Sequence, residues 1–252
     1  MTRLQQAISR IQRREGPRLG FGAPSRERPR AMLAAALAND GKAIPGLIEA
    51  GADLVLVEAA NAAAYASATS GAEAGEVVLG ALLPALDGSA AAELKEAGCD
   101  FVVSPLAETA SVAIDPDGIG VVIRAPGDAS DATLRAIGPL GLEGMYLEVP
   151  AATLALPEQL GLVRLASLTS TPLIAAVGGV PEVPDLRVLR DSGVAAIVLP
   201  AAAGVKKLTA LVNNLKAVPA PNKSRRERGG EAAFVPSIAP AAEPDSDEPD
   251  DE

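Results

Sequence analysis

The stretch Pro172–Pro200, PLIAAVGGVPEVPDLRVLRDSGVAAIVLP, decides the fold of this chain. It predicts a buried strand, a glycine turn, a helix and a second buried strand in immediate succession. Both strands are nearly continuous apolar runs, which is typical of parallel strands that are covered on both faces. Because crossovers between parallel strands are right-handed, the two strands should be neighbours in one sheet with the helix packed over them.

The same strand-then-helix unit is predicted eight times along the chain. Several of the predicted helices end in related sequences, EAGAD, EAGCD and DSGVA, in which glycine suits a left-handed C-cap and the next strand follows at once. Eight even units without a long switch connection favour a closed (β/α)8 TIM barrel over an open doubly wound sheet, the main alternative. The predicted strands are 31–38, 53–58, 77–84, 100–105, 118–126, 144–150, 172–179 and 195–200.

The barrel is expected to occupy residues 30–218, between two segments of different character. In residues 1–29, an apolar face at helical spacing predicts an amphipathic helix over residues 2–14, which should cover the barrel bottom or pack beside it. Residues 219–252 are rich in proline, glycine and charge, and they end in EPDSDEPDDE. This composition predicts a disordered acidic tail.

The composition excludes several classes of catalytic chemistry. The 252 residues include no histidine and a single cysteine, Cys99. Without histidine there can be no Ser-His-Asp triad, no Cys-His dyad and no histidine-ligated metal. One cysteine excludes structural zinc and cysteine-ligated iron–sulfur clusters. Any catalysis must use carboxylates, Arg, Lys, Tyr, Ser, backbone amides or a bound cofactor.

Charge and hydropathy bear on partners and location. The formal net charge is −10, with basic residues concentrated in residues 1–30 and an acidic run at the end. An acidic chain is a poor nucleic-acid binder, and no apolar run approaches the ~18 residues of a membrane helix. With one cysteine and no secretory signal, these features predict a cytoplasmic protein without nucleic-acid or membrane partners. Its charged termini are the candidate contacts for a protein partner.

In a barrel of this kind the functional site lies at the carboxyl ends of the strands. Three otherwise apolar strands end there in charge, at Glu58, Arg124 and Glu148. A charge in that position needs solvent, a partner or a ligand. One interpretation is that Arg124 holds an anionic group of the substrate while Glu58 or Glu148 transfers a proton. The other is a structural Arg–Glu ion pair at the rim.

Gly178 and Gly179 follow the seventh predicted strand and form a second candidate site. Paired glycines let backbone amides approach a phosphate, and the N-terminus of the next helix adds a favourable dipole. The stretch Pro172–Pro200 resembles the seventh- and eighth-strand region of phosphate-binding TIM barrels. Similar sequences occur in nitronate monooxygenases and other FMN enzymes, in thiamine-phosphate synthases and in sugar-acid aldolases. The resemblance implies a phosphate site at Gly178, Gly179 and Gly204, with FMN as a candidate cofactor.

The chain departs from these families at identifiable places. After the eighth predicted strand, LPAAAGV lacks their Gly-Ser or Gly-Thr turn, Pro200 has no N–H to donate, and Gly204 replaces that turn only in part. No predicted strand carries the lysine of a Schiff-base aldolase, and the histidine often used by the flavin enzymes is absent. Magnesium bound by Glu58, Asp87 and Glu148 is an alternative that the sequence leaves open.

Two functions from different classes are compatible with these features. The first is an enzyme or binding protein for a small phosphorylated or anionic ligand, with FMN among the candidates. The second is a barrel without catalysis that serves as a structural or interaction module through its charged termini. The sequence does not identify a reaction, a substrate or an oligomeric state.

Overall fold

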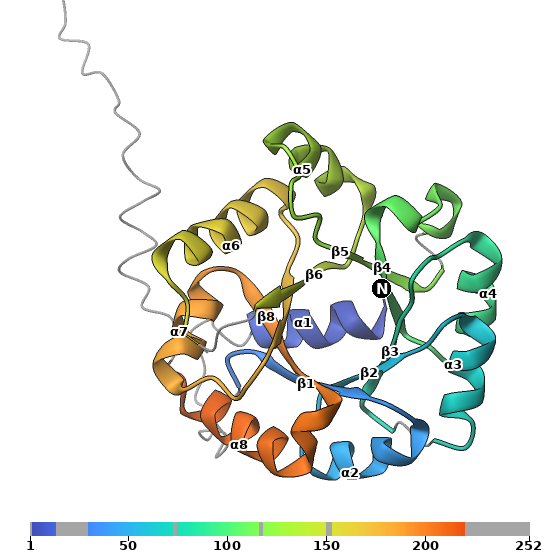
Figure 1. The fold of residues 1–252 in the computed structure, drawn as a ribbon, viewed down its shortest axis with the longest axis horizontal. Coiled ribbons are helices and arrows are strands. Elements are labelled where there is room, and N and C mark those ends of the chain that lie inside the picture. Colours follow the sequence, from blue (N-terminus) through green and yellow to red (C-terminus); the bar gives the residue numbers. More distant parts are fainter. Residues whose placement is uncertain (1, 14–29, 73–74, 116–117, 150–152, 220–252) are drawn as a thin grey trace, which may run out of the picture. The chain divides into compact units, whose positions relative to one another are not determined.

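The computed structural model describes residues 2–13, 30–72, 75–115, 118–149 and 153–219. Within these residues, eight parallel strands form a closed barrel in chain order, and the last strand pairs with the first. Figure 1 looks along the barrel and shows the helices arranged around the strands. The predicted (β/α)8 barrel is confirmed, and the alternative prediction of an open doubly wound sheet is wrong.

The observed elements match the predicted units, with small changes at their ends. The strands are β1 (Leu33–Ala38), β2 (Leu54–Glu58), β3 (Val78–Leu82), β4 (Phe101–Pro105), β5 (Gly120–Arg124), β6 (Gly144–Val149), β7 (Leu173–Val177) and β8 (Val194–Leu199). The α-helices are α1 (Arg3–Arg13), α2 (Ile44–Glu49), α3 (Ala62–Thr69), α4 (Gly88–Glu96), α5 (Asp131–Ile137), α6 (Leu156–Thr169), α7 (Val183–Asp191) and α8 (Gly204–Ala217). The 3-10 turns are η1 (Gly41–Ala43), η2 (Leu106–Glu108), η3 (Ser111–Ala113), η4 (Gly138–Leu140) and η5 (Ala201–Ala203).

The core has two parts because side chains alternate between the two faces of each strand. One set packs between the strands and the surrounding helices, as Val55 and Val57 do from β2. The other set fills the barrel and is called the interior cluster below. Its buried members are Leu4, Ile8, Leu33, Ala35, Leu54, Leu56, Val78, Leu82, Phe101, Val103, Val122, Tyr146, Ile174, Ala196 and Val198. Both faces of the sheet are covered, which explains the uninterrupted apolar runs of the sequence.

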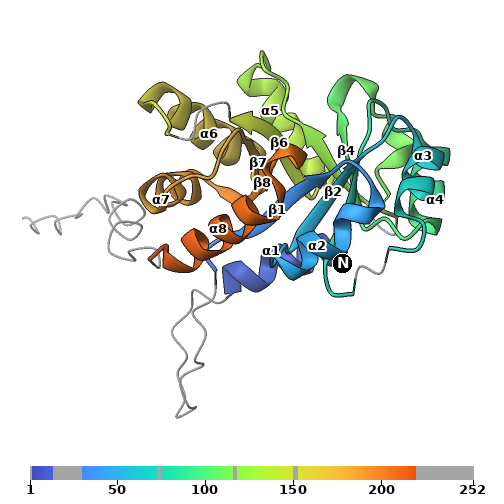
Figure 2. The same cartoon turned by 60° about the horizontal axis from the view of Figure 1, so that its bottom comes forward.

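Helix α1 closes the amino-terminal end of the barrel, which is called the bottom below. Leu4 and Ile8 project from α1 into the interior cluster, and Leu4 is fully buried. Arg3 forms an ion pair of 3.2 Å with Asp100, which immediately precedes β4. In Figure 2, α1 lies beneath the strands. The structure thus confirms that the predicted amphipathic helix covers the bottom of the barrel.

The connection after β4 departs from the repeated strand-then-helix unit, which predicts a helix there. The 3-10 turns η2 and η3 take its place. The hydroxyl of Thr109 donates to the carbonyl of Pro105 at 2.7 Å, and Thr109 forms an isolated parallel bridge with Leu86 in the loop after β3. These tertiary contacts interrupt the segment at Thr109 and prevent a continuous helix.

Parts of the predicted organisation lie outside the described residues. These are the segment 14–29 and, apart from Pro219, the predicted acidic tail 219–252. In the portion of the chain that is described, no helix combines the length and the hydropathy that a membrane span requires.

Candidate functional site

Charged groups at the bottom of the barrel have partners within the fold. Asp53 precedes β2 and forms an ion pair of 2.8 Å with Arg30, while Asp100 precedes β4 and pairs with Arg3. Each aspartate also accepts a backbone N–H of the preceding strand at 2.8 Å. These carboxylates are the two aspartates of the EAGAD and EAGCD sequences, and their contacts tie neighbouring strands together.

The three predicted residues Glu58, Arg124 and Glu148 lie at the opposite end, which is called the mouth below. They end or nearly end β2, β5 and β6, and all three are exposed. Each follows a member of the interior cluster by two residues along its strand. Because side chains alternate along a strand, all three occupy positions on the inner face of the barrel.

Tyr146 lies between these charges, one layer deeper in the barrel. Its side chain is 2 % exposed and belongs to the interior cluster. The guanidinium carbon of Arg124 lies 5.9 Å from the centroid of the Tyr146 ring, which is a cation–π contact between register partners on β5 and β6. The sequence could not decide whether this tyrosine points into the barrel; it does.

The pKa of Tyr146 reports on its surroundings. Burial is the main cause that raises this pKa, and the negative charges of Glu148 and Glu58 raise it further, while Arg124 opposes them. The charges at the ends of β2, β5 and β6 thus all act on this phenol. Arg124 lies over its ring and Glu148 follows it by two residues on β6, while Glu58 ends β2, which pairs with neither of those strands.

The alternative of a structural ion pair at the rim is not observed. Among the described residues, the salt bridges of 4.0 Å or less involve Arg3, Arg30, Arg164 and Arg190, and none joins Arg124 to a carboxylate. Arg124 thus contacts the ring of Tyr146 but has no acidic partner among the residues that the structure describes. Its donors can serve a ligand.

The predicted phosphate-binding glycines lie on two neighbouring connections at the mouth. Gly178 and Gly179 follow β7, and Gly204 opens α8 after β8. Gly204 has a φ of +68°, and a Cβ added at Gly179 or Gly204 would meet no atom within 4 Å, so both glycines border open space.

The turn η5 lies between β8 and Gly204. Phosphate sites of this fold combine the loops after the last two strands with the N-terminus of a short extra helix, and η5 occupies that place in the chain. Sequence reasoning missed it, because AAA between Pro200 and Gly204 carries no turn signal.

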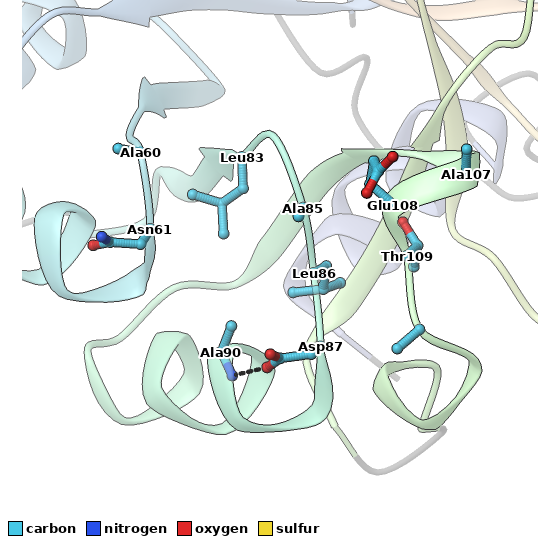
Figure 3. A pocket seen from close by; sticks show the side chains of 11 residues that line it. Ala60, Asn61, Leu83, Ala85, Leu86, Asp87, Ala90, Ala107, Glu108 and Thr109 are labelled. Carbon is cyan, nitrogen blue, oxygen red and sulfur yellow. Dashed lines mark hydrogen bonds between the residues drawn. The ribbon is translucent and has the colours of Figure 1, made fainter.

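A pocket of about 500 Å³ opens at the same end of the barrel, on the loops that follow β2, β3 and β4 (Figure 3). Alanine and leucine side chains form most of its wall, and Asn61, Asp87 and Glu108 are among its polar groups. Asp87 caps α4 by accepting hydrogen bonds from the backbone N–H of Ala90 and the hydroxyl of Ser89, and these bonds lower its pKa. This pocket could not be predicted from the sequence, because alanines in loops do not indicate how the loops lie against one another.

The magnesium alternative finds no support in the described residues. They contain no group of three or more Asp, Glu, His or Cys side chains that could hold a metal ion. Asp87, one of the three ligands considered, is occupied as the cap of α4.

Comparison with known proteins identifies the fold and no family. Neither a protein-family model nor a curated protein matches the sequence. Tryptophan synthase from M. tuberculosis superposes with a TM-score of 0.60 at 13% identity, over 87% of this chain and 100% of that chain. The 3-keto-L-gulonate-6-phosphate decarboxylase of Vibrio cholerae gives 0.58 at 12%, over 75% and 99%. Phosphoribosyl anthranilate isomerase from Thermus Thermophilus gives 0.55 at 16%, over 75% and 100%. At these identities the likeness shows a shared barrel fold and does not transfer an activity.

Proposed function

We propose that this barrel binds a small phosphorylated or anionic ligand at its mouth. The observation that carries the proposal is Arg124, which ends β5 at the mouth, lies over the ring of Tyr146 and is paired to no carboxylate among the described residues. Unpaired charge at the carboxyl ends of barrel strands is the usual mark of a site that is completed by a ligand.

The charges of the mouth narrow the ligand class. Two carboxylates and one guanidinium favour a molecule that brings an anionic group to Arg124 and offers O–H or N–H donors to Glu58 and Glu148. A phosphorylated molecule with several hydroxyl groups has these properties. Two of the structural neighbours, a decarboxylase and an isomerase, are named after phosphorylated compounds, which supports this choice.

Each group receives a role under this proposal. The backbone of Gly178 and Gly179 contacts the phosphate beside η5, and Arg124 holds a second anionic or polar oxygen. Gly204 contributes only the open space of a residue without a side chain, because its N–H donates to the carbonyl of Ala201. If the protein is an enzyme, a glutamate of the mouth gives or takes the proton, since carboxylates are the acid–base groups that the site offers. FMN is the larger candidate ligand of the same chemistry.

The second function considered, an interaction module that works through charged termini, is not favoured by the described residues. The apolar face of α1 is used within the barrel, and Arg3 is engaged with Asp100. The acidic segment of that hypothesis lies outside the described residues.

The test is calorimetric titration with matched pairs of ligands: ribose 5-phosphate against ribose, and FMN against riboflavin. The phosphorylated member of at least one pair should bind and its uncharged partner should not. In R124Q the affinity should fall about ten- to a hundredfold, because a hydrogen bond to a charged group contributes about 1.5–3 kcal/mol. The same substitution in the last turn of α5, R135Q, should leave the affinity unchanged. If the wild-type protein binds neither phosphorylated compound, nor inorganic phosphate, nor the three-carbon anions named in the next subsection at millimolar concentration, the proposal is wrong.

A further inference from the structure

The Tyr146 hydroxyl has no function in the fold. In the part of the chain that the structure describes, it makes no hydrogen bond. Two other side-chain atoms, the Tyr65 hydroxyl and Glu143 Oε2, are fully buried and lack a hydrogen-bond partner among the described residues. The Tyr146 hydroxyl differs from them because it is not fully buried. The small exposure of the Tyr146 side chain, 2 %, therefore includes its hydroxyl. A nearly buried donor without a partner among the described residues requires an explanation.

Packing does not explain this hydroxyl. The ring fills the interior cluster and lies under the guanidinium of Arg124, and phenylalanine would fill the same volume and offer the same ring face. Taking a hydroxyl out of water without a partner is unfavourable. The sequence therefore places a polar atom where an apolar one would serve the barrel at least as well.

The surroundings show which kind of partner would suit it. A tyrosine hydroxyl can donate one hydrogen bond, and the planar guanidinium of an arginine carries five N–H donors. A partner of both groups must therefore be a hydrogen-bond acceptor. Burial and the two glutamates raise the pKa of Tyr146, so the phenol keeps its proton throughout the neutral range. The hydroxyl and the guanidinium of Arg124 thus belong to register partners on β5 and β6 that touch through the ring, and neither donor has an acceptor among the described residues.

We propose that Tyr146 is a ligand-binding residue that acts with Arg124: its ring orients the guanidinium, and its hydroxyl donates a hydrogen bond to the same ligand oxyanion. The inference rests on the proposed function, because it concerns the ligand of that site. It adds a specificity-determining group that neither the charges of the sequence nor the structural neighbours indicate. The oxyanion is a carboxylate or a phosphate.

The chain provides its own spectroscopic probe for this proposal. It contains no tryptophan and two tyrosines, of which Tyr65 is fully buried with a sealed hydroxyl. A change in tyrosine fluorescence when a ligand binds should therefore come from Tyr146. The variant Y65F keeps Tyr146 as its single tyrosine and should retain both the affinity and the signal.

The decisive variant is Y146F, which keeps the ring and removes the hydroxyl. The probes are 3-phosphoglycerate, glycerol 3-phosphate and glycerate, which carry both oxyanions, the phosphate alone and the carboxylate alone. For at least one probe, Y146F should lose about tenfold in affinity, while its thermal midpoint and its circular dichroism match those of the wild type. The probe whose affinity responds identifies the oxyanion. The variant Y146L should lose more, because Arg124 then also loses its ring contact.

Different results reject the two proposals. If the wild type binds a probe and R124Q weakens it while Y146F binds as tightly as the wild type, the role of Tyr146 is rejected and the proposed function stands. Binding that leaves the fluorescence of Y65F unchanged rejects the role of Tyr146 in the same way. If the wild type binds none of these probes, none of the phosphorylated compounds above and no inorganic phosphate, both proposals are rejected.

Discussion

The two ends of the barrel treat charge in opposite ways. At the bottom, Asp53 and Asp100 each form an ion pair with an arginine and accept a hydrogen bond from a backbone N–H of the neighbouring strand. At the mouth, Arg124 has a ring beneath it and no carboxylate partner among the described residues. The same barrel therefore satisfies charges at one end and leaves them available at the other.

Under the proposed function, this difference separates charges that stabilise the fold from charges that bind a ligand. A charged group that finds its partners within the fold is explained by the fold, as at the bottom, where α1 also seals the interior. A charged group that faces an opening without a partner in the fold is, under the proposed function, available to a ligand. Substitutions at the two ends of the barrel test this distinction.

The largest loss of stability is expected from the helix that seals the bottom. Leu4 is fully buried in the interior cluster, so L4A should lower the free energy of unfolding by about 2–5 kcal/mol. Urea denaturation measures this loss. The control is L160A on α6, where the side chain is 60% exposed and the loss should stay within about 0.5 kcal/mol. Equal losses in the two variants would mean that α1 does not seal the barrel.

Removing a paired carboxylate should have the next largest effect. D100A leaves the backbone N–H of Leu79 and the guanidinium of Arg3 without their acceptor, so it should lose about 1–3 kcal/mol. E148A at the mouth removes an exposed carboxylate without an ion pair and should change stability by less than about 0.5 kcal/mol. A loss in E148A as large as that in D100A would show that the glutamate is structural.

Glu143 is the exception at the bottom, and it predicts a dependence on pH. It is 6% exposed, its Oε2 has no partner among the described residues, and burial raises its pKa although Thr2 donates a hydrogen bond to it. The folded protein therefore keeps this proton to higher pH than the unfolded chain, whose value is near 4.5. Stability from this group is thus fully present below that value and is lost as the pH rises through the raised pKa.

The amide variant E143Q tests this exception. It should be more stable than the wild type at pH 8 by about 1 kcal/mol, and this difference should shrink towards pH 4. The measurement is urea denaturation across that range of pH, with the exposed E93Q on α4 as the control. A difference that is independent of pH would show that Glu143 is not the titrating group.

The smallest effect concerns the balance of charge at the mouth. E58Q removes a negative charge near the proposed anion site and should tighten the binding of inorganic phosphate by a few-fold, which corresponds to about 0.5–1 kcal/mol. The gain should disappear at high salt, because the group is exposed. Calorimetry at two ionic strengths measures it, and weaker binding in E58Q would mean that this glutamate contacts the anion through a shared proton.

The sequence predicted the barrel and the charged strand ends because their signals are local. An apolar run, a glycine C-cap and a charge that ends a strand can each be recognised within a few residues, as at Glu58 and Arg124. No local signal shows whether Tyr146 points into the barrel. The residues on both sides of it along the strand are apolar, so the sequence does not distinguish the inner face of the strand from the outer face. The turns after β4 also depended on a distant contact, between Thr109 and Leu86.

The missing ion pair and the pocket could not be predicted for a related reason. Whether Arg124 reaches a glutamate depends on distances between side chains across the mouth, and strand spacing in the sequence does not determine them. The pocket depends on how three loops of small residues lie against one another. The sequence thus supplied the candidate residues, and only the structure supplied their arrangement.

The distinction between the two ends is tested most directly by one arginine from each. Arg30 pairs with Asp53 at the bottom, and Arg124 lies over Tyr146 at the mouth. The measurement is the free energy of unfolding of R30Q and R124Q in urea, with and without saturating ligand. R30Q should lose about 1–3 kcal/mol without ligand and keep the full increase when ligand is added. R124Q should keep the wild-type stability and lose that increase. An R124Q protein that is destabilised like R30Q and still stabilised by ligand would contradict the account.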